Sequence, residues 1–261
     1  MDVNPGKFTN VALLRTLHKI DWLWRNAPVQ QPQPEQQGEQ LRCIPLSAIE
    51  GAGSSQGFAE FLVDAYFKHF HTTYPILHEA TFRAQFSEVL PRPTKEAWLV
   101  LSRSVLSIGA WCTGHWISNG DGRDPADCLQ IFEHIDLFRL GCLTMVQGLT
   151  LLACFLDKQS KSNMASIYLA TAVKMGLSLG LNRELHDWDI SLLEREMRRR
   201  VWWCLYVLES GQSMAMGRPI LMPSANAMDI RLPLNIPEQV GSLNKSFVYD
   251  AKRAVGFDSK D

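Results

Sequence analysis

Residues 191–219 read SLLEREMRRRVWWCLYVLESGQSMAMGRP and carry the signals of a long α-helix. Ser191, followed three positions later by Glu194, forms a capping box, in which each side chain satisfies a backbone N–H at the start of a helix. Gly217 is typical of a helix C-terminus, especially with a proline shortly beyond it. We therefore predict a helix from residue 191 to about residue 216.

Helical periodicity continues through the part of the chain that precedes this segment. From Phe58 onward apolar residues recur near a period of 3.6, and no sustained alternation is bounded by hairpin turns. Pro75 ends the first of these segments, because a proline ring disfavours helical backbone in the residue before it. We predict an all-α fold, an irregular bundle of about seven to nine helices, with the others near residues 58–74, 79–90, 94–116, 144–155 and 160–179 and one starting at Asp124.

The predicted helix over residues 160–179 has a pattern that suggests how it packs. Its buried side is predicted to consist of residues at helical spacing, namely Ile167, Ala170, Val173 and Leu177. Small side chains on the same segment would let a neighbouring helix approach closely, namely Ala165, Ala170, Ala172 and Gly176.

Shifts in composition divide the chain into four parts. Residues 1–26 form an amphipathic N-terminal segment, and residues 27–57 are rich in Pro, Gln and Gly. Such a composition buries too little apolar surface to offset its ordering entropy, so we expect a disordered linker there. Residues 58–235 are predicted to form the helical domain, with a C-terminal tail at 236–261.

Composition and charge exclude several classes of protein. The 261 residues are 46% hydrophobic, which is ordinary for a globular chain and far from the composition of a disordered one. The 26 basic and 27 acidic side chains nearly balance, whereas nucleic-acid-binding domains carry clustered Lys and Arg. We therefore expect no direct specific binding of DNA by this chain.

The six cysteines indicate free thiols rather than a metal site or a disulfide framework. None forms a C-x-x-C pair, and zinc modules space their ligands two to four residues apart. The N-terminus lacks the apolar run of a signal peptide, and no stretch is long enough to span a bilayer. We expect no metal, no cofactor and no membrane contact.

Other candidate sites are interpreted as structural. The aromatic run Tyr66–Tyr74 is expected in the core, and His69 and His71 point to different helical faces, which disfavours a shared metal ion. The run Arg198–Arg200 is expected to be a solvated helix face paired with Glu194 and Glu196. Trp202 is adjacent to Trp203, so at most one of these indoles faces the deepest core and the other is expected to cover a helix interface. No nucleophile motif or catalytic carboxylate pair is present, so the chain is predicted not to be an enzyme.

Three blocks in a fixed order resemble the fungal-specific transcription factor domain, the middle homology region of fungal zinc-cluster transcription factors. They are residues 66–82, YFKHFHTTYPILHEATF, residues 170–183, ATAVKMGLSLGLNR, and residues 196–219, which match a signature of the form E-RRR-WW-LY-D-GRP. The chain departs from that signature at Glu209, where the family usually has Asp, and it lacks the cysteine-rich DNA-binding module. The resemblance implies structural roles for the signature residues Tyr74, Pro75, His78, Phe82, Gly176, Leu177, Gly180, Leu181, Arg199, Arg200, Trp202, Trp203, Gly217, Arg218 and Pro219.

The resemblance implies a nuclear protein that regulates transcription by RNA polymerase II as the regulatory domain of a zinc-cluster-type factor. Zinc is expected only in the missing DNA-binding module. The partners implied are other proteins or a second copy of the chain, together with a small-molecule inducer. Two alternatives stay open, namely a stand-alone or truncated interaction module that modulates full-length activators, and an all-α enzyme or small-molecule-binding protein.

Overall fold

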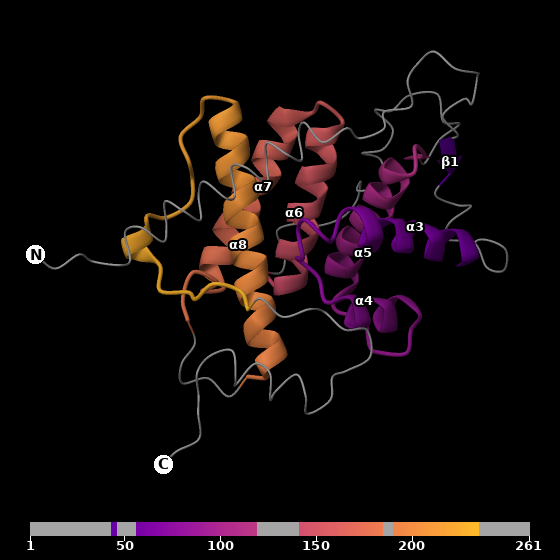
Figure 1. Cartoon of the computed structure of the whole chain (residues 1–261), viewed down its shortest axis with the longest axis horizontal. Coiled ribbons are helices and arrows are strands. Elements are labelled where there is room, and N and C mark those ends of the chain that lie inside the picture. The colour runs from indigo at the N-terminus through magenta and orange to yellow at the C-terminus, as the bar shows by residue number, and fades with distance from the viewer. Residues whose placement is uncertain (1–42, 46–55, 119–140, 185–189, 235–261) are drawn as a thin grey trace, which may run out of the picture.

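The computed structural model describes residues 43–45, 56–118, 141–184 and 190–234 (Figure 1). The predicted amphipathic segment at 1–26, most of the predicted linker, the helix predicted to start at Asp124 and the tail at 236–261 lie outside these residues.

The regular secondary structure of the described residues is almost entirely helical, as predicted. They form six α-helices and a short 3-10 helix, namely α3 (Gln56–His69), α4 (Glu79–Phe86), α5 (Lys95–Cys112), α6 (Leu143–Lys158), α7 (Ser162–Ser178), α8 (Leu192–Ala215) and η2 (Ala225–Ala227). The exception is a parallel pairing of two three-residue strands, β1 (Cys43–Pro45) and β2 (Trp116–Ser118). The predicted count of seven to nine helices is therefore not confirmed within the described part of the chain.

The helices pack in series around one core. α6 lies between α5 and α7, while α8 packs on α7 and α6 and α3 packs on α5. Figure 1 shows α6, α7 and α8 side by side, with α3 on the far side of α5 from α8. None of the helices in the described ranges has both the length and the hydrophobicity of a membrane span.

The aromatic run on α3 and after it lies in the core, as predicted. Tyr66, Phe67, Phe70 and Tyr74 are all buried, and Tyr66 packs edge-on against Phe67 with ring centroids 5.0 Å apart. Edge-to-face pairs of this kind contribute about 0.5–1.5 kcal/mol beyond the area they bury. Phe67 also packs edge-on against Phe82 with ring centroids 5.8 Å apart, so the aromatic residues join α3 to α4.

Two glycines allow the helices around α5 to approach one another. A Cβ atom on Gly109 of α5 would lie 2.1 Å from the backbone oxygen of Leu62 in α3, and one on Gly148 of α6 would lie 2.9 Å from Val100. Only a residue without a side chain fits at such distances. Because the contacts join segments far apart in the chain, periodicity did not reveal them.

The buried side of α7 differs from the prediction. Ile167 is 66% exposed and Ala170 and Leu177 are only partly buried, whereas Val173 is buried as predicted. The other buried residues of α7 are Ala165, Leu169, Ala172 and Gly176, so the stripe that packs lies beside the predicted one. The small residues Ala165, Ala172 and Gly176 are buried as predicted, whereas Ala170 is only partly so.

Candidate functional site: the polar network along α8

α8 begins where the capping signal predicts. The hydroxyl oxygen of Ser191 accepts a hydrogen bond from the backbone N–H of Glu194 at 3.1 Å. Satisfying this otherwise unpaired donor fixes the first turn. The next turns carry Glu196, Arg199 and Arg200, and all three side chains are buried.

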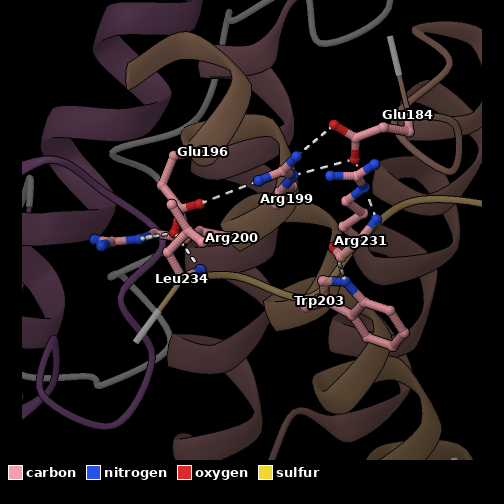
Figure 2. Close-up of polar contacts among 7 residues, drawn as sticks. All are labelled: Glu184, Glu196, Arg199, Arg200, Trp203, Arg231 and Leu234. Carbon is pink, nitrogen blue, oxygen red and sulfur yellow. Dashed lines mark hydrogen bonds and ion pairs between the residues drawn. The ribbon is translucent and has the colours of Figure 1, made fainter. Parts of the chain in front are cut away.

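The strongest interaction in this region joins Arg199 of α8 to Glu184, which lies beyond the end of α7. The guanidinium donates to both carboxylate oxygens, from Nε at 3.1 Å and from Nη2 at 2.5 Å, and the two side chains are only 8% and 1% exposed (Figure 2). Arg200 donates to Glu196 at 3.1 Å, one turn away. The predicted pairing with Glu196 is confirmed for Arg200, but the prediction of a solvated face is wrong, because Glu184 covers Arg199.

The chain after α8 returns along the same helix in the opposite direction. We call residues 218–234 the returning segment. Its backbone N–H groups donate to buried carboxylates, from Leu221 to Glu209 at 2.9 Å and from Leu234 to Glu196 at 3.0 Å. Contacts therefore run from the C-terminal part of α8 back to its first turns.

Between these two points the returning segment is held at Arg231. Its backbone N–H donates to Glu184 at 3.1 Å, and its carbonyl accepts a hydrogen bond from the indole N–H of Trp203 at 2.9 Å (Figure 2). Glu184 thus binds α8 through Arg199 and the returning segment through the backbone of Arg231. One carboxylate joins two segments that are distant in the sequence.

A second set of hydrogen bonds holds the same segment to the end of α7. The side chain of Asn182 donates to the carbonyl of Ala227 at 3.1 Å, and its backbone carbonyl accepts a hydrogen bond from the backbone N–H of Asp229 at 3.2 Å. The carboxylate of Asp229 in turn accepts the backbone N–H of Glu184 at 3.0 Å. The returning segment is therefore fixed at both α7 and α8.

The fold shifts the pKa values of two buried carboxylates of the network, Glu184 and Glu196, in opposite directions. At Glu184 burial disfavours the charge, but hydrogen bonds from Arg199 and from the backbone of Arg231 outweigh it and lower the pKa. At Glu196 burial dominates over the hydrogen bond from Arg200, so its pKa is raised. Glu184 is consequently the firmly ionised member, and Glu196 is the one closer to accepting a proton.

The arrangement is suited to holding segments together rather than to bond making. In the described ranges no group of three His, Cys, Asp or Glu side chains converges as metal ligands do. Burial raises the pKa of Cys204 to about 12 and that of Cys112 to about 11, so both thiols are protonated at neutral pH and poorly nucleophilic.

Sequence comparison matches residues 63–257 to the fungal specific transcription factor domain. The chain belongs to this family. The match confirms the resemblance in the three sequence blocks, and it starts within α3 and runs beyond the described residues.

Relatives with curated names are fungal transcription regulators. The chain is 32% identical over 171 residues to the lactose regulatory protein LAC9 of Kluyveromyces lactis, covering 66% of this chain and 19% of that protein. It is 27% identical over 221 residues to the transcription factor lepE of Aspergillus flavus, covering 77% and 26%. With the cutinase transcription factor 1 alpha of Fusarium vanettenii the identity is 24% over 168 residues, covering 61% and 18%. The chain thus spans about a fifth to a quarter of these relatives. No solved structure matches it.

The fungal specific transcription factor signature in α8 divides between the core and the network. Trp202 is fully buried, whereas Trp203 is partly exposed, packs on Tyr206 with ring centroids 5.5 Å apart and lies against the returning segment. At most one indole was expected in the deepest core, and Trp202 is that one. The prediction that the other covers a helix interface is wrong, because Trp203 contacts an extended segment.

The signature glycines end helices. Gly180 adopts φ +65, and the N–H of Leu181 bonds to the carbonyl of Gly176 at 2.9 Å, while Gly180 itself bonds to Leu177 at 3.0 Å. This closes α7 as a Schellman motif. A Cβ on Gly176 would lie 3.7 Å from Trp202, so this glycine also faces the central indole of α8.

Gly217 ends α8 in the same way, with φ +64, just before Pro219. The N–H of Arg218 bonds to the carbonyl of Ser213 at 2.8 Å, and its guanidinium donates to Asn163 of α7 at 2.5 Å. The backbone of Arg218 therefore closes the helix, and its side chain meets an amide on α7.

The first signature block lies away from the α8 network, at the turn into α4. Tyr74 is buried and Pro75 partly so, and both precede the N-cap residue His78, whose Nδ1 accepts the backbone N–H of Thr81 at 3.3 Å. Phe82 is buried and packs on Trp98 with ring centroids 5.5 Å apart. The structure therefore brings the second and third blocks together and leaves the first block at a separate position.

Three members of the network carry no signal in the sequence. Glu184 was not singled out because a single acid after a predicted helix end resembles many surface acids. Arg231 and Leu234 contribute backbone groups, which every residue has, and Arg231 is 47 positions from Glu184.

Proposed function

We propose that this chain is the regulatory domain of a fungal zinc-cluster-type factor and acts in the nucleus to control transcription by RNA polymerase II. The observation that carries the proposal is the family match over residues 63–257, together with relatives that are named as transcription regulators. The chain is proposed to have no catalytic activity and to leave DNA binding and zinc to a separate module.

The physical basis of the proposed regulation is coupling between packed segments. Glu184 and Arg199 join the end of α7, the middle of α8 and the returning segment in one buried arrangement. Buried charge pairs are stable only with their partners in place, so such a network favours discrete arrangements over gradual deformation. A partner or ligand that binds one arrangement better than another shifts the population toward it.

The partners proposed are other regulatory proteins or a second copy of this chain, with a small molecule as the inducing signal. Of the segments described, the returning segment is the best placed to report such binding. Its outer apolar side chains Ile220, Leu221 and Leu232 are exposed, at 48%, 52% and 42%, while its backbone is held by α8.

A reporter assay tests the regulatory role. The full chain would be fused to an unrelated sequence-specific DNA-binding domain in yeast, and a fluorescent tag would report its location. We expect reporter output that differs from that of the DNA-binding domain alone, with the fusion in the nucleus. Unchanged output at equal protein abundance would contradict the proposal.

A gel-shift assay and a metal analysis of the unfused chain test whether DNA binding and zinc belong to a separate module. We expect no sequence-specific band shift and no stoichiometric zinc. Specific DNA binding by the chain would show that recognition is not left to a separate module, and inhibition of full-length factors by the free chain would favour a stand-alone interaction module.

A further inference from the structure

A cavity of about 230 Å³ opens between the turn into α4 and the first turns of α8. α5 and the start of α6 close its other sides, and Figure 1 shows α4 at the same end of the bundle as the start of α8. The first and third signature blocks, which the α8 network does not connect, therefore meet at this cavity through His78 and Met197.

The inner wall of the cavity is apolar. Leu77, Phe82, Leu101 and Met197 line it, and each of these side chains is buried. Transfer of an apolar group from water to such a wall is favourable by about 25 cal/mol per Å². For comparison, a cavity of about 150 Å³ lined by similar residues accommodates benzene. The cavity is therefore large enough for a single ring with a short substituent.

One buried amide gives the cavity a directional polar group. Gln147 is 8% exposed, and its side-chain N–H donates to the carbonyl of Ile76 at 2.8 Å. Because Ile76 offers an acceptor there, the amide nitrogen is fixed on that side and the amide oxygen is left as an acceptor. A ligand with an O–H or N–H group satisfies it.

The charge at the cavity favours cations and disfavours anions. Among the described residues that line it there is no Lys or Arg, whereas the exposed carboxylate of Glu194 stands at the rim. An anionic ligand would lose its hydration without gaining a positive partner, which costs free energy. A cationic or neutral hydrogen-bond donor has no such cost.

We propose that this cavity binds a small apolar molecule that carries an ammonium or another hydrogen-bond donor, of the size of a monocyclic amine. Met197 and Glu194 flank Glu196 on α8, so the ligand would contact the helix turn that holds the end of the returning segment. Binding itself stands on the cavity alone, and its effect on transcription rests on the proposed function.

Matched probes test the class of ligand with the full chain in solution. Titration calorimetry would compare 2-phenylethylamine with phenylacetate, which share a ring and a chain but differ in charge. We expect the amine to bind and the carboxylate to bind at least roughly fivefold more weakly, the size of effect expected from a charge at a solvated rim. Equal binding, tighter binding of the carboxylate, or no binding of the amine would overturn the proposal.

Variants and spectra locate the binding site. Thr144→Phe places a ring in the cavity and should abolish amine binding. Glu194→Gln should reduce the ratio of the affinity for the amine to the affinity for the carboxylate. The control Glu60→Gln, on the exposed side of α3, should change neither. On addition of the amine, amide chemical-shift changes in the unaltered chain should centre on Thr81 and Gln147. Changes confined to other residues would overturn the assignment of the site. This test holds even if Thr144→Phe does not fold. The binding measurements do not depend on transcription. A failed reporter assay would therefore contradict the proposed function without contradicting the binding site.

Discussion

The indole N–H of Trp203 donates to the backbone carbonyl of Arg231 at 2.9 Å, which ties α8 to a residue 28 positions further along the chain. The returning segment is also held by the carboxylates of Glu184, Glu196 and Glu209 and by the side chain of Asn182. Apart from the short helix η2, the segment therefore depends on side chains of α8 and of the residues that follow α7.

Trp203→Phe removes the indole N–H and keeps most of the ring. We expect a loss of about 1 kcal/mol of stability, the usual contribution of one hydrogen bond. Amide hydrogen exchange should become faster at Arg231 and Leu234, while the amides of α5 keep their protection. Unchanged exchange at both residues would show that this bond does not hold the segment.

Arg199→Ala leaves Glu184 buried without its cation. Breaking a buried ion pair on one side typically costs about 3–5 kcal/mol, and we expect a loss of that size in urea unfolding. The control is Glu88→Gln, which removes only the exposed ion pair of Glu88 with Arg92 and should cost at most about 1 kcal/mol. Similar losses in both variants would contradict the role given to burial.

The pKa of Glu184 is lowered in the folded chain, so the unfolded chain binds the proton more tightly. The stability that this carboxylate contributes is complete above its unfolded pKa of about 4.3 and is lost as the pH falls through the lower, folded pKa. Urea unfolding should show the difference between the unaltered chain and Glu184→Gln shrinking as the solution is acidified. A difference that stays constant with pH would contradict the assignment.

Glu196 should behave in the opposite sense. The pKa of Glu196 is raised in the folded chain, so protonation of this carboxyl favours the folded state. Stability is therefore lost as the pH rises from the unfolded pKa of Glu196 to its higher, folded pKa. In the same titration, Glu196→Gln should remove this decrease of the free energy of unfolding with rising pH. A slope of the same sign as that of Glu184 would show that Arg200 outweighs burial.

Gly109→Ala introduces a methyl group where the backbone oxygen of Leu62 lies 2.1 Å away. Overpacking of this kind costs about 1–3 kcal/mol or more, and thermal unfolding should occur at a lower temperature. Gly57→Ala is the control, because nothing lies within 4 Å of its Cβ position and alanine favours helix there. Equal tolerance of both changes would contradict the close contact of α3 with α5.

Local signals in the sequence predicted the local features of this fold. The capping box at Ser191 and the glycines at Gly180 and Gly217 end or begin helices where expected, because caps depend on residues a few positions apart. Periodicity identifies an apolar stripe on a helix, but it does not show which of two adjacent stripes packs against a neighbouring helix. The exposed Ile167 is an example.

The network could not be predicted because its partners are distant in the sequence. Arg199 is charged and lies in an arginine-rich turn, so a solvated face was the natural expectation. Its burial depends on Glu184, 15 positions away, and on the backbone of Arg231, which become neighbours only after α7 and α8 pack. No local pattern encodes that meeting.

The reporter fusion tests the central claim most directly when it compares the unaltered chain, Trp203→Phe and Glu88→Gln at equal abundance. We predict that the unaltered fusion changes reporter output relative to the DNA-binding domain alone, that Trp203→Phe shifts this output and that Glu88→Gln does not. If the unaltered fusion gives the same output as the DNA-binding domain alone, the regulatory role is contradicted. If the unaltered chain and Trp203→Phe give identical output, the role of the returning segment is contradicted.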